Sequence, residues 1–186
     1  PGLHMPVKDF RNHMPTEVET AYIVGNFAVT VDDMARFSID GGIYAPYAKD
    51  LTGSGYPFYC GKAGFDAVVC LSARELAELS RDARRTYLRV DEVEAACISL
   101  YINGRYIDVK YWSPYVFDVT GCFGEGENRI KAVASATLFN LMGPNRMVGI
   151  KQAESVGPHS FIASDKYTEK YQLFPFGIGK GVLFII

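Results

Sequence analysis

The sequence lacks the features that mark several broad classes of protein. No apolar run approaches the roughly 20 residues that a membrane-spanning helix needs, and the terminal run Val182 to Ile186 is only long enough for a strand. No basic run is present and the net charge is -2, which argues against a nucleic-acid-binding surface. We therefore expect neither a membrane nor a nucleic acid as a partner.

Metal-binding signatures are missing as well. The four cysteines form no C-x-x-C motif and no Cys/His spacing of the zinc type. Asp32, Asp33 and Asp40 carry oxygens suited to a structural calcium, but no D-x-D-x-D-G spacing supports one. We assign no cofactor and no metal ligand. Cys70 and Cys97 lie within apolar runs, so we predict that both are buried as small hydrophobic side chains.

The sequence also contains no recognisable catalytic constellation. The three histidines have no Gly-x-Ser-x-Gly motif to accompany them, so a Ser-His-Asp triad is not expected. Gly177 to Gly181 has the glycines of a phosphate-binding loop, but a strand-like run follows where such a loop needs a helix. Carboxylates are plentiful, and no pair stands out as a general acid and base. We assign no catalytic residue.

The length and composition are those of one globular domain. The chain has 186 residues, of which 48% are hydrophobic, 22% charged and 13% aromatic. Residues 1–20 show no periodicity, so we interpret them as a leading segment, in part vector-derived, and residues 21–186 as a single domain. Because the numbering begins at Pro1 with no initiator Met, we expect a fragment of a longer protein.

Alternating apolar residues predict about ten short strands. The expected strands are 21–31, 36–40, 65–71, 87–90, 95–102, 105–109, 115–119, 129–136 and 181–186, with weaker candidates at 159–163 and 171–174. One helix is expected over 73–84, because Ser72 and Glu75 have the spacing of a capping box. Many strands without helix–strand alternation predict an all-β fold, an antiparallel β-sandwich with one short inserted helix.

The stretch from Cys97 to Asn140 has the clearest local pattern. Asn103-Gly104 separates two apolar runs and is the favoured dipeptide of a two-residue type I′ turn, which needs φ > 0 at both positions. A second turn, Gly124 to Asn128, again places two glycines where the chain must reverse. We expect these turns to set the pairing of the runs beside them. Within the runs, alternation points one set of side chains to the core: Ile98, Leu100, Ile102, Ile130, Ala132 and Ala134.

This stretch resembles a galactose-binding-like jelly-roll domain. The resemblance is carried by Tyr101–Gly104, Ser113–Tyr115, Phe117–Thr120, Gly126–Ile130 and a strand that closes on Asn140. Domains of this kind accompany the catalytic modules of many glycoside hydrolases, and the family 2 enzymes contain one as their sugar-binding domain. The resemblance implies that the sandwich is a jelly roll.

The resemblance also implies a function. We expect a non-catalytic accessory domain of a glycoside hydrolase, with carbohydrate as a weak ligand and the catalytic domain of the parent chain as a partner. Two alternatives stay open: the chain contributes part of the hydrolase active site, or it is a structural module between domains that binds no sugar. An extracellular or periplasmic location would follow if the parent protein degrades polysaccharide.

One connection stands out as a candidate sugar-binding surface. Sugar rings place C–H groups on aromatic faces and hydroxyls on polar side chains. Tyr111 and Trp112, the only tryptophan, connect two strands, and Tyr106 and Arg105 stand close by in sequence. We predict that these four residues form a weak carbohydrate-binding surface. The alternative, and the commoner role for a large aromatic residue, is that Trp112 closes the end of the core.

Overall fold

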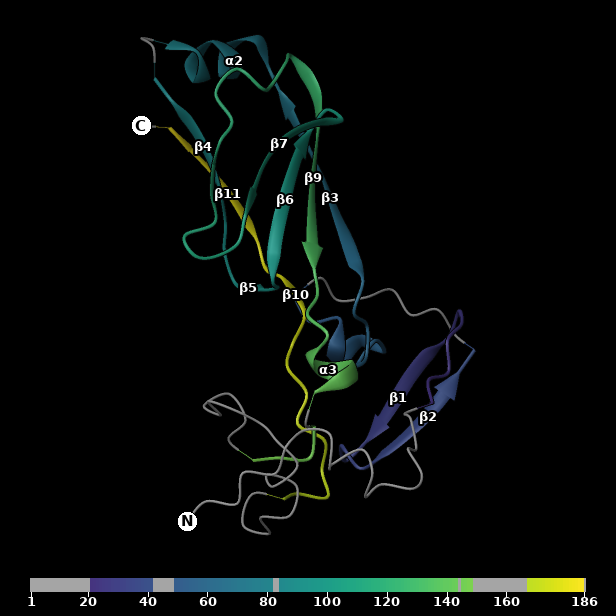
Figure 1. Cartoon of the computed structure of the whole chain (residues 1–186). Helices are drawn as coiled ribbons and strands as arrows, with labels where there is room; N and C mark the ends of the chain where they lie inside the picture. Colours follow the sequence, from purple (N-terminus) through teal and green to yellow (C-terminus); the bar gives the residue numbers. More distant parts are fainter. Residues whose placement is uncertain (1–20, 42–48, 82–83, 144, 149–166, 186) are drawn as a thin grey trace, which may run out of the picture.

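The main body of the protein is a sandwich of two antiparallel sheets (Figure 1). The computed structural model describes residues 21–41, 49–81, 84–143, 145–148 and 167–185. One sheet has the strand order β3-β9-β6-β7 and the other the order β11-β4-β8. The predicted all-β fold, an antiparallel sandwich with few helices, is confirmed. The predicted leading segment and the candidate strand at 159–163 lie outside the described residues.

Most strands are short, and only two of the described strands, β3 and β9, reach ten residues. The four-stranded sheet contains β3 (Lys62–Leu71), β9 (Gly126–Ser135), β6 (Cys97–Ile102) and β7 (Arg105–Lys110). The three-stranded sheet contains β11 (Gly181–Ile185), β4 (Thr86–Val90) and β8 (Val116–Asp118). Two further pairs are β1 (Ala28–Asp32) with β2 (Arg36–Asp40), and β5 (Val93–Glu94) with β10 (Gly177–Ile178). The helical segments are η1 (Thr52–Ser54), α2 (Ala73–Leu79) and α3 (Phe139–Met142).

The core lies between the two large sheets and follows the predicted alternation. The exposed fractions are 0% for Ile98, Leu100 and Ala134, 1% for Ile102, 6% for Ala132 and 9% for Ile130. The three-stranded sheet contributes Leu88, Val90 and Phe117 from the opposite side. Burying one aliphatic side chain completely stabilises the folded state by about 1.5–3 kcal/mol. The side chains at these alternating positions therefore hold the two sheets together.

The two glycine-containing turns have different roles. Asn103 and Gly104 have φ of 51° and 80°, as a type I′ turn requires, and they join β6 to β7 as predicted. The second turn does not pair the strands on its two sides. Strand β8 pairs with β4, whereas β9 pairs with β3 and β6, so the chain crosses here from one sheet to the other. The expectation that this turn sets a local pairing is therefore wrong.

Asn128 explains how the crossing is held. Its side chain is 1% exposed and makes four hydrogen bonds. Its Oδ1 accepts from the Gly124 amide at 2.8 Å and from Asn103 Nδ2 at 2.9 Å, while its Nδ2 donates to the carbonyls of Gly124 and Gly126. The Asn103 Oδ1 in turn accepts from the Arg129 amide at 2.9 Å. Two asparagine side chains thus join both turns at one end of the sandwich.

Helix α2 begins as predicted and ends early. Ser72 and Glu75 form the full capping box, because the Ser72 hydroxyl accepts from the Glu75 amide and the Glu75 carboxylate accepts from the Ser72 amide. The helix ends at Leu79 rather than Arg84. None of its side chains is buried, and a short helix without a packed face has little to extend it.

The first predicted strand is too long, and one cysteine is misplaced. Strand β1 begins at Ala28 rather than Ala21, because its partner β2 ends opposite Ala28 and earlier residues have no strand to pair with. Val24, before it, is 92% exposed. Cys70 is exposed rather than buried, since its neighbours Val69 and Leu71 take the inward positions of β3. Cys97 is half-buried, and all four cysteines are free.

The expected strand at 171–174 is extended chain held by side chains. The Phe174 amide donates to Asn140 Oδ1 at 2.9 Å, and its carbonyl accepts from Asn140 Nδ2 at 2.8 Å and from the Thr52 hydroxyl at 3.0 Å. Asn140 itself lies in α3 and not in a strand, because β9 ends at Ser135. Side-chain groups thus replace the neighbouring strand that a sheet would need.

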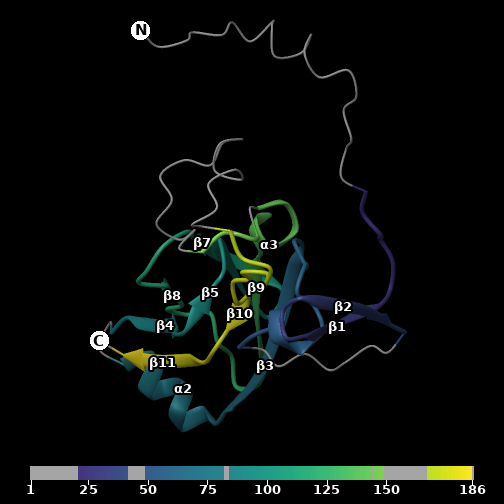
Figure 2. The same ribbon diagram turned by 90° about the horizontal axis from the view of Figure 1, so that it is seen from below.

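The β1–β2 hairpin stands beside the sandwich, on the β3 side (Figure 2). The Val29 amide donates to the Gly55 carbonyl at 2.9 Å, and the Tyr171 amide donates to the Met34 carbonyl at 2.8 Å. Phe37 packs against Tyr171 with ring centroids 4.7 Å apart. These contacts attach the hairpin while leaving a space between it and the body. Within the described ranges, no helix is both long and apolar enough to cross a bilayer.

Candidate functional site

Tyr111 and Trp112 lie exposed directly after β7. Lys110, the last residue of β7, pairs with Ile98, so the loop lies at the end of the hairpin opposite the Asn103-Gly104 turn. Trp112 is 75% exposed and Tyr111 59% exposed, and their ring centroids are 6.2 Å apart with a 37° angle between the planes. The alternative that Trp112 closes the core is therefore wrong. Most of the Trp112 side chain is accessible to solvent.

Tyr106 belongs to a second aromatic pair on the same strand. It is 50% exposed and lies opposite Tyr101, with ring centroids 5.5 Å apart. The pKa of the Tyr106 hydroxyl is raised, first by partial desolvation and then by Asp108 and Tyr111, so it stays a neutral donor at physiological pH. Tyr101 was not predicted as a site residue. Counting outward from the two-residue turn would have placed it opposite Tyr106.

Arg105 does not join these aromatic residues. It lies opposite Ile102, which is 1% exposed, so it sits on the core side of the sheet, and Tyr106, next along the strand, lies on the other. Burial raises the pKa of the Cys122 thiol and the nearby Arg105 charge opposes that rise, which places Arg105 near the crossing between the sheets. Of the four predicted site residues, Tyr111 and Trp112 are in contact with each other, and Tyr111 is close enough to Tyr106 to influence its pKa.

A β-bulge in β7 places its charged residues on the core side. Tyr101 pairs with Tyr106 but Leu100 pairs with Asp108, so Ile107 is the extra residue. Beyond the bulge, Asp108 pairs with Leu100 and Lys110 pairs with Ile98. Both partners are fully buried, so Asp108 and Lys110 lie on the core side of the sheet, where they form an ion pair of 2.6 Å. Inward charges on an edge strand discourage pairing with another chain. The bulge thus protects this edge and leaves the outer face to aromatic side chains.

The three aspartates considered for calcium do not form one ligand set. Asp32 ends β1 beside the hairpin turn, whereas Asp40 ends β2 at the far end of the hairpin. Asp33 instead forms an ion pair of 2.7 Å with Lys170. In the part of the chain that the structure describes, no three His, Cys, Asp or Glu side chains are grouped to hold a metal ion.

Among the residues that the structure describes, three carboxyl groups have a shifted pKa, and all three shifts favour the charged form. Hydrogen bonds from Ser72 lower the pKa of Glu75, the bond from Lys110 lowers that of Asp108, and bonds from Thr120 lower that of Asp118. A glycosidic general acid needs the opposite shift, because it must carry a proton at neutral pH. None of these three groups has the environment of a catalytic acid.

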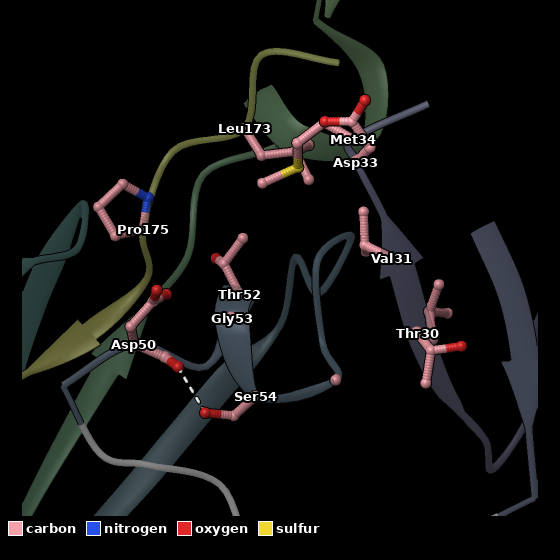
Figure 3. A pocket seen from close by; sticks show the side chains of 12 residues that line it. Thr30, Val31, Asp33, Met34, Asp50, Thr52, Gly53, Ser54, Leu173 and Pro175 are labelled. Atoms are coloured by element: carbon pink, nitrogen blue, oxygen red, sulfur yellow. Dashed lines mark hydrogen bonds between the residues drawn. The ribbon is translucent and has the colours of Figure 1, made fainter. Parts of the chain in front are cut away.

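A cleft of about 950 Å³ lies between the β1–β2 hairpin and the turn that contains η1 (Figure 3). Val29 and Val31 line one wall, and the segment from Asp50 to Gly55 lines the other together with Leu173 and Pro175. The Ser54 hydroxyl donates to the Asp50 carbonyl at 2.7 Å, which shapes this wall.

One carboxylate oxygen of Asp50, a residue of the cleft lining, is unusual because it is buried without a hydrogen bond. Its Oδ1 is buried and has no hydrogen-bond partner among the described residues. Figure 3 shows the carboxylate pointing toward Thr52 and Pro175. Sequence reasoning missed this residue, and no local signal would have identified it, since the walls come from parts of the chain more than 100 residues apart.

Comparison with known proteins gives a fold relationship. No family model matches the sequence, and no curated protein matches it. A rhamnosidase from Novosphingobium sp. PP1Y is similar over 92% of this chain and 16% of its own, with 17% identity and a TM-score of 0.52. A β-glucuronidase from Bifidobacterium dentium is similar over 44% of this chain and 12% of its own, with 20% identity and a TM-score of 0.37.

The rhamnosidase similarity shows the fold alone. The β-glucuronidase score is too low to support an argument. A β-glucuronidase from Ruminococcus gnavus, with a TM-score of 0.35 at 20% identity, is equally weak, covering 42% of this chain and 13% of the enzyme. This chain thus spans between 12% and 16% of the length of these glycoside hydrolases. The similarity of fold is therefore to one part of the rhamnosidase.

Proposed function

We propose that this chain is a non-catalytic accessory domain of a glycoside hydrolase, of the galactose-binding-like jelly-roll type. The observation that carries the proposal is the asymmetry of the rhamnosidase match, in which 92% of this chain corresponds to 16% of the enzyme. A domain that small within a glycosidase is the expected size of an accessory module. The partner of the domain is then the catalytic part of the same protein.

The carboxylates support a non-catalytic role. Glycoside hydrolysis generally uses two carboxyl groups, one of which is kept protonated by its surroundings. Glu75, Asp108 and Asp118 are instead held in their charged forms by local hydrogen bonds. Turnover of aryl glycosides by the rigorously purified chain alone would contradict this role and favour a contribution to the active site.

The domain binds carbohydrate weakly through an aromatic surface, which consists of Tyr106 in β7 and of Tyr111 and Trp112 directly after β7. Trp112, Tyr111 and Tyr106 are 75%, 59% and 50% exposed, so their rings are accessible to the C–H groups of a sugar and the tyrosine hydroxyls to its hydroxyls. Stacking contributes about 0.5–1.5 kcal/mol per aromatic contact beyond burial. A few such contacts support a total near 4 kcal/mol, which corresponds to a Kd of about 1 mM.

Trp112→Ala tests this surface. Retention of the domain on a polysaccharide gel should be lost, while the melting temperature should change by no more than about 2 °C, because exposed substitutions shift stability by about 0.5 kcal/mol at most. Tyr22→Ala is the matched control, since Tyr22 is 46% exposed and lies before β1. Equal retention of Trp112→Ala and wild type would refute the surface. No retention of the wild type on any polysaccharide would favour a structural module that binds no sugar.

A further inference from the structure

A hollow of about 590 Å³ at the end of the sandwich nearest α3 combines aromatic rings with an exposed carboxylate (Figure 1). Its lining includes Tyr59, Glu94, Thr137, Phe139 and Phe174. We propose that this hollow binds an amino sugar residue, a hexose that carries an ammonium group, with Glu94 as the partner of the ammonium. The inference rests on the proposed carbohydrate-binding function and names a further site and a ligand class for it.

Aromatic side chains make up a large share of the lining. Four of the ten lining residues are aromatic, compared with 13% of the whole chain. Tyr59 stacks on the buried ring of Phe176 with centroids 6.0 Å apart, and Phe139 meets Phe174 edge to face at 4.5 Å. Tyr59 is 38% exposed and both members of the second pair are half-buried, so three of these rings keep accessible surface. Rings that already pack on each other need little ordering when the C–H groups of a sugar contact them.

Glu94 is the charged residue of the lining. It ends β5, opposite Gly177 of β10, and its side chain is exposed, so a ligand in the hollow can reach it. Within the described ranges, the Glu94 carboxylate makes no ion pair and no hydrogen bond. Glu92, two residues earlier, is instead paired with Lys49 at 3.1 Å and does not line the hollow. Glu94 is therefore the carboxylate here that is available to a ligand.

The charge and the rings together select a cationic ligand. An anionic sugar would face Glu94, and among the described residues no lysine or arginine of the lining offsets that charge. A neutral sugar offers only hydroxyl donors to the carboxylate. An ammonium group gains an ion pair with the carboxylate and an attraction to the negative faces of nearby rings. Because the carboxylate is exposed, we expect the gain to be modest, about fivefold in affinity.

Two hydroxyl groups of the lining residues favour a sugar over a simple amine. The Thr137 hydroxyl accepts from the Phe139 amide at 3.3 Å and keeps its own proton for a ligand oxygen. The Tyr59 hydroxyl donates to the Lys62 carbonyl at 2.7 Å and keeps lone pairs to accept from a ligand hydroxyl. A sugar that carries hydroxyls beside its ammonium group uses both, whereas a simple amine uses neither.

The hollow and the aromatic surface share one end of the sandwich. Cys97, which begins β6, pairs with Ser135 at the end of β9. Ile98, the next residue, pairs with Lys110 at the end of β7. Neighbouring strands are about 4.8 Å apart, so the ends of β9 and β7, on either side of β6, are about 10 Å apart. The hollow begins directly after β9 and the exposed loop directly after β7, so one polysaccharide chain is long enough to reach both, and linked sites bind more tightly than either alone.

The test is an NMR titration of the ¹⁵N-labelled chain with glucosamine, glucose and glucuronate, each up to about 50 mM at about pH 6, where the amine is protonated. Glucosamine should shift the amide signals of Ala95 and Thr137 and bind about fivefold more tightly than glucose, with glucuronate the weakest of the three. Glu94→Gln should lower the affinity for glucosamine about fivefold and change that for glucose less than about twofold. Glu92→Gln is the matched control and should change the affinity for glucosamine less than about twofold, because that carboxylate is already paired with Lys49.

A second variant tests the rings, and three outcomes would overturn the proposal. Tyr59→Leu should weaken glucose and glucosamine alike by about threefold, because it removes a ring without changing the charge. An unchanged preference for glucosamine in Glu94→Gln would remove the role of the carboxylate. Methylammonium binding as tightly as glucosamine would show that the hollow recognises an ammonium on any carrier. Absence of shifts at Ala95 and Thr137 would show that no sugar binds there. Trp112→Ala should leave these shifts intact, so the hollow and the aromatic surface stand or fail separately.

Discussion

Asn128→Ala should destabilise the protein more than any other single polar substitution in its outer turns. The side chain is 1% exposed and makes four hydrogen bonds to Asn103, Gly124 and Gly126. A hydrogen bond contributes about 0.5–1.5 kcal/mol, and buried partners left unpaired add to the loss. Four bonds at one site give roughly 2–6 kcal/mol before allowing for their mutual dependence, so we expect a loss of about 3–4 kcal/mol.

The assay is thermal and urea denaturation of wild type and variant. For a domain of 150–250 residues, each kcal/mol shifts the melting temperature by about 2–4 °C, so a decrease of roughly 10 °C is expected. Amide exchange should quicken first at Gly124 and Arg129, because the loss of Asn128 frees the crossing between the sheets. A melting temperature within about 2 °C of wild type would refute the reasoning, since the asparagine pair would then not hold the turns.

Asn128→Asp is the matched variant. It keeps an oxygen for the Asn103 amide and for the Gly124 N–H, but it loses both donors and faces two carbonyls with a negative charge. Burial against carbonyls favours the protonated form of the introduced carboxyl, so its folded-state pKa should be raised. The variant should then regain stability as the pH falls toward about 4, in contrast to Asn128→Ala. Equal pH dependence of the two variants would contradict this environment.

Three further predictions concern the local devices of the fold. Asn103→Gly removes the side-chain hydrogen bonds and should lower the free energy of unfolding, measured in urea, by about 1–2 kcal/mol. Asn103→Ala should lower it by about 1–2 kcal/mol more, because alanine, unlike glycine, is strained at the φ of 51° found here. Ser72→Ala should destabilise α2 by about 1 kcal/mol, seen as faster exchange of the Leu76 amide with little change in melting temperature, since α2 buries no side chain. Hydrogen bonds from Thr120 lower the pKa of Asp118 below its ordinary 3.8. The ionised carboxylate therefore stabilises the fold above pH 3.8, and this stability is lost as the pH falls through the lower folded-state pKa. Asp118→Asn should reduce the decline of the urea midpoint that wild type shows below about pH 4.

The sequence determined the parts of this protein that depend on near neighbours in the chain. The period of two in Ile98, Leu100 and Ile102 assigns both the strand and its buried face, because successive side chains point to opposite sides. Asn103-Gly104 specifies a tight hairpin because its two residues tolerate positive φ. The capping box of α2 is likewise closed within four residues.

Only the tertiary structure decided which distant segments meet. The residues near Gly124 do not predict that β8 and β9 belong to different sheets. The sheet that each strand joins depends on its partners, which are β4 for β8 and β3 and β6 for β9. The exposure of Trp112 likewise depends on what the rest of the chain leaves uncovered.

The cleft around Asp50 shows the same dependence most clearly. The Thr52 hydroxyl meets the Phe174 carbonyl across 122 residues, and the extended segment that this bond holds lines the cleft beside Asp50. An unpaired buried oxygen exists only when all its surroundings are assembled, because burial and hydrogen bonding are properties of the packed chain and not of the residue.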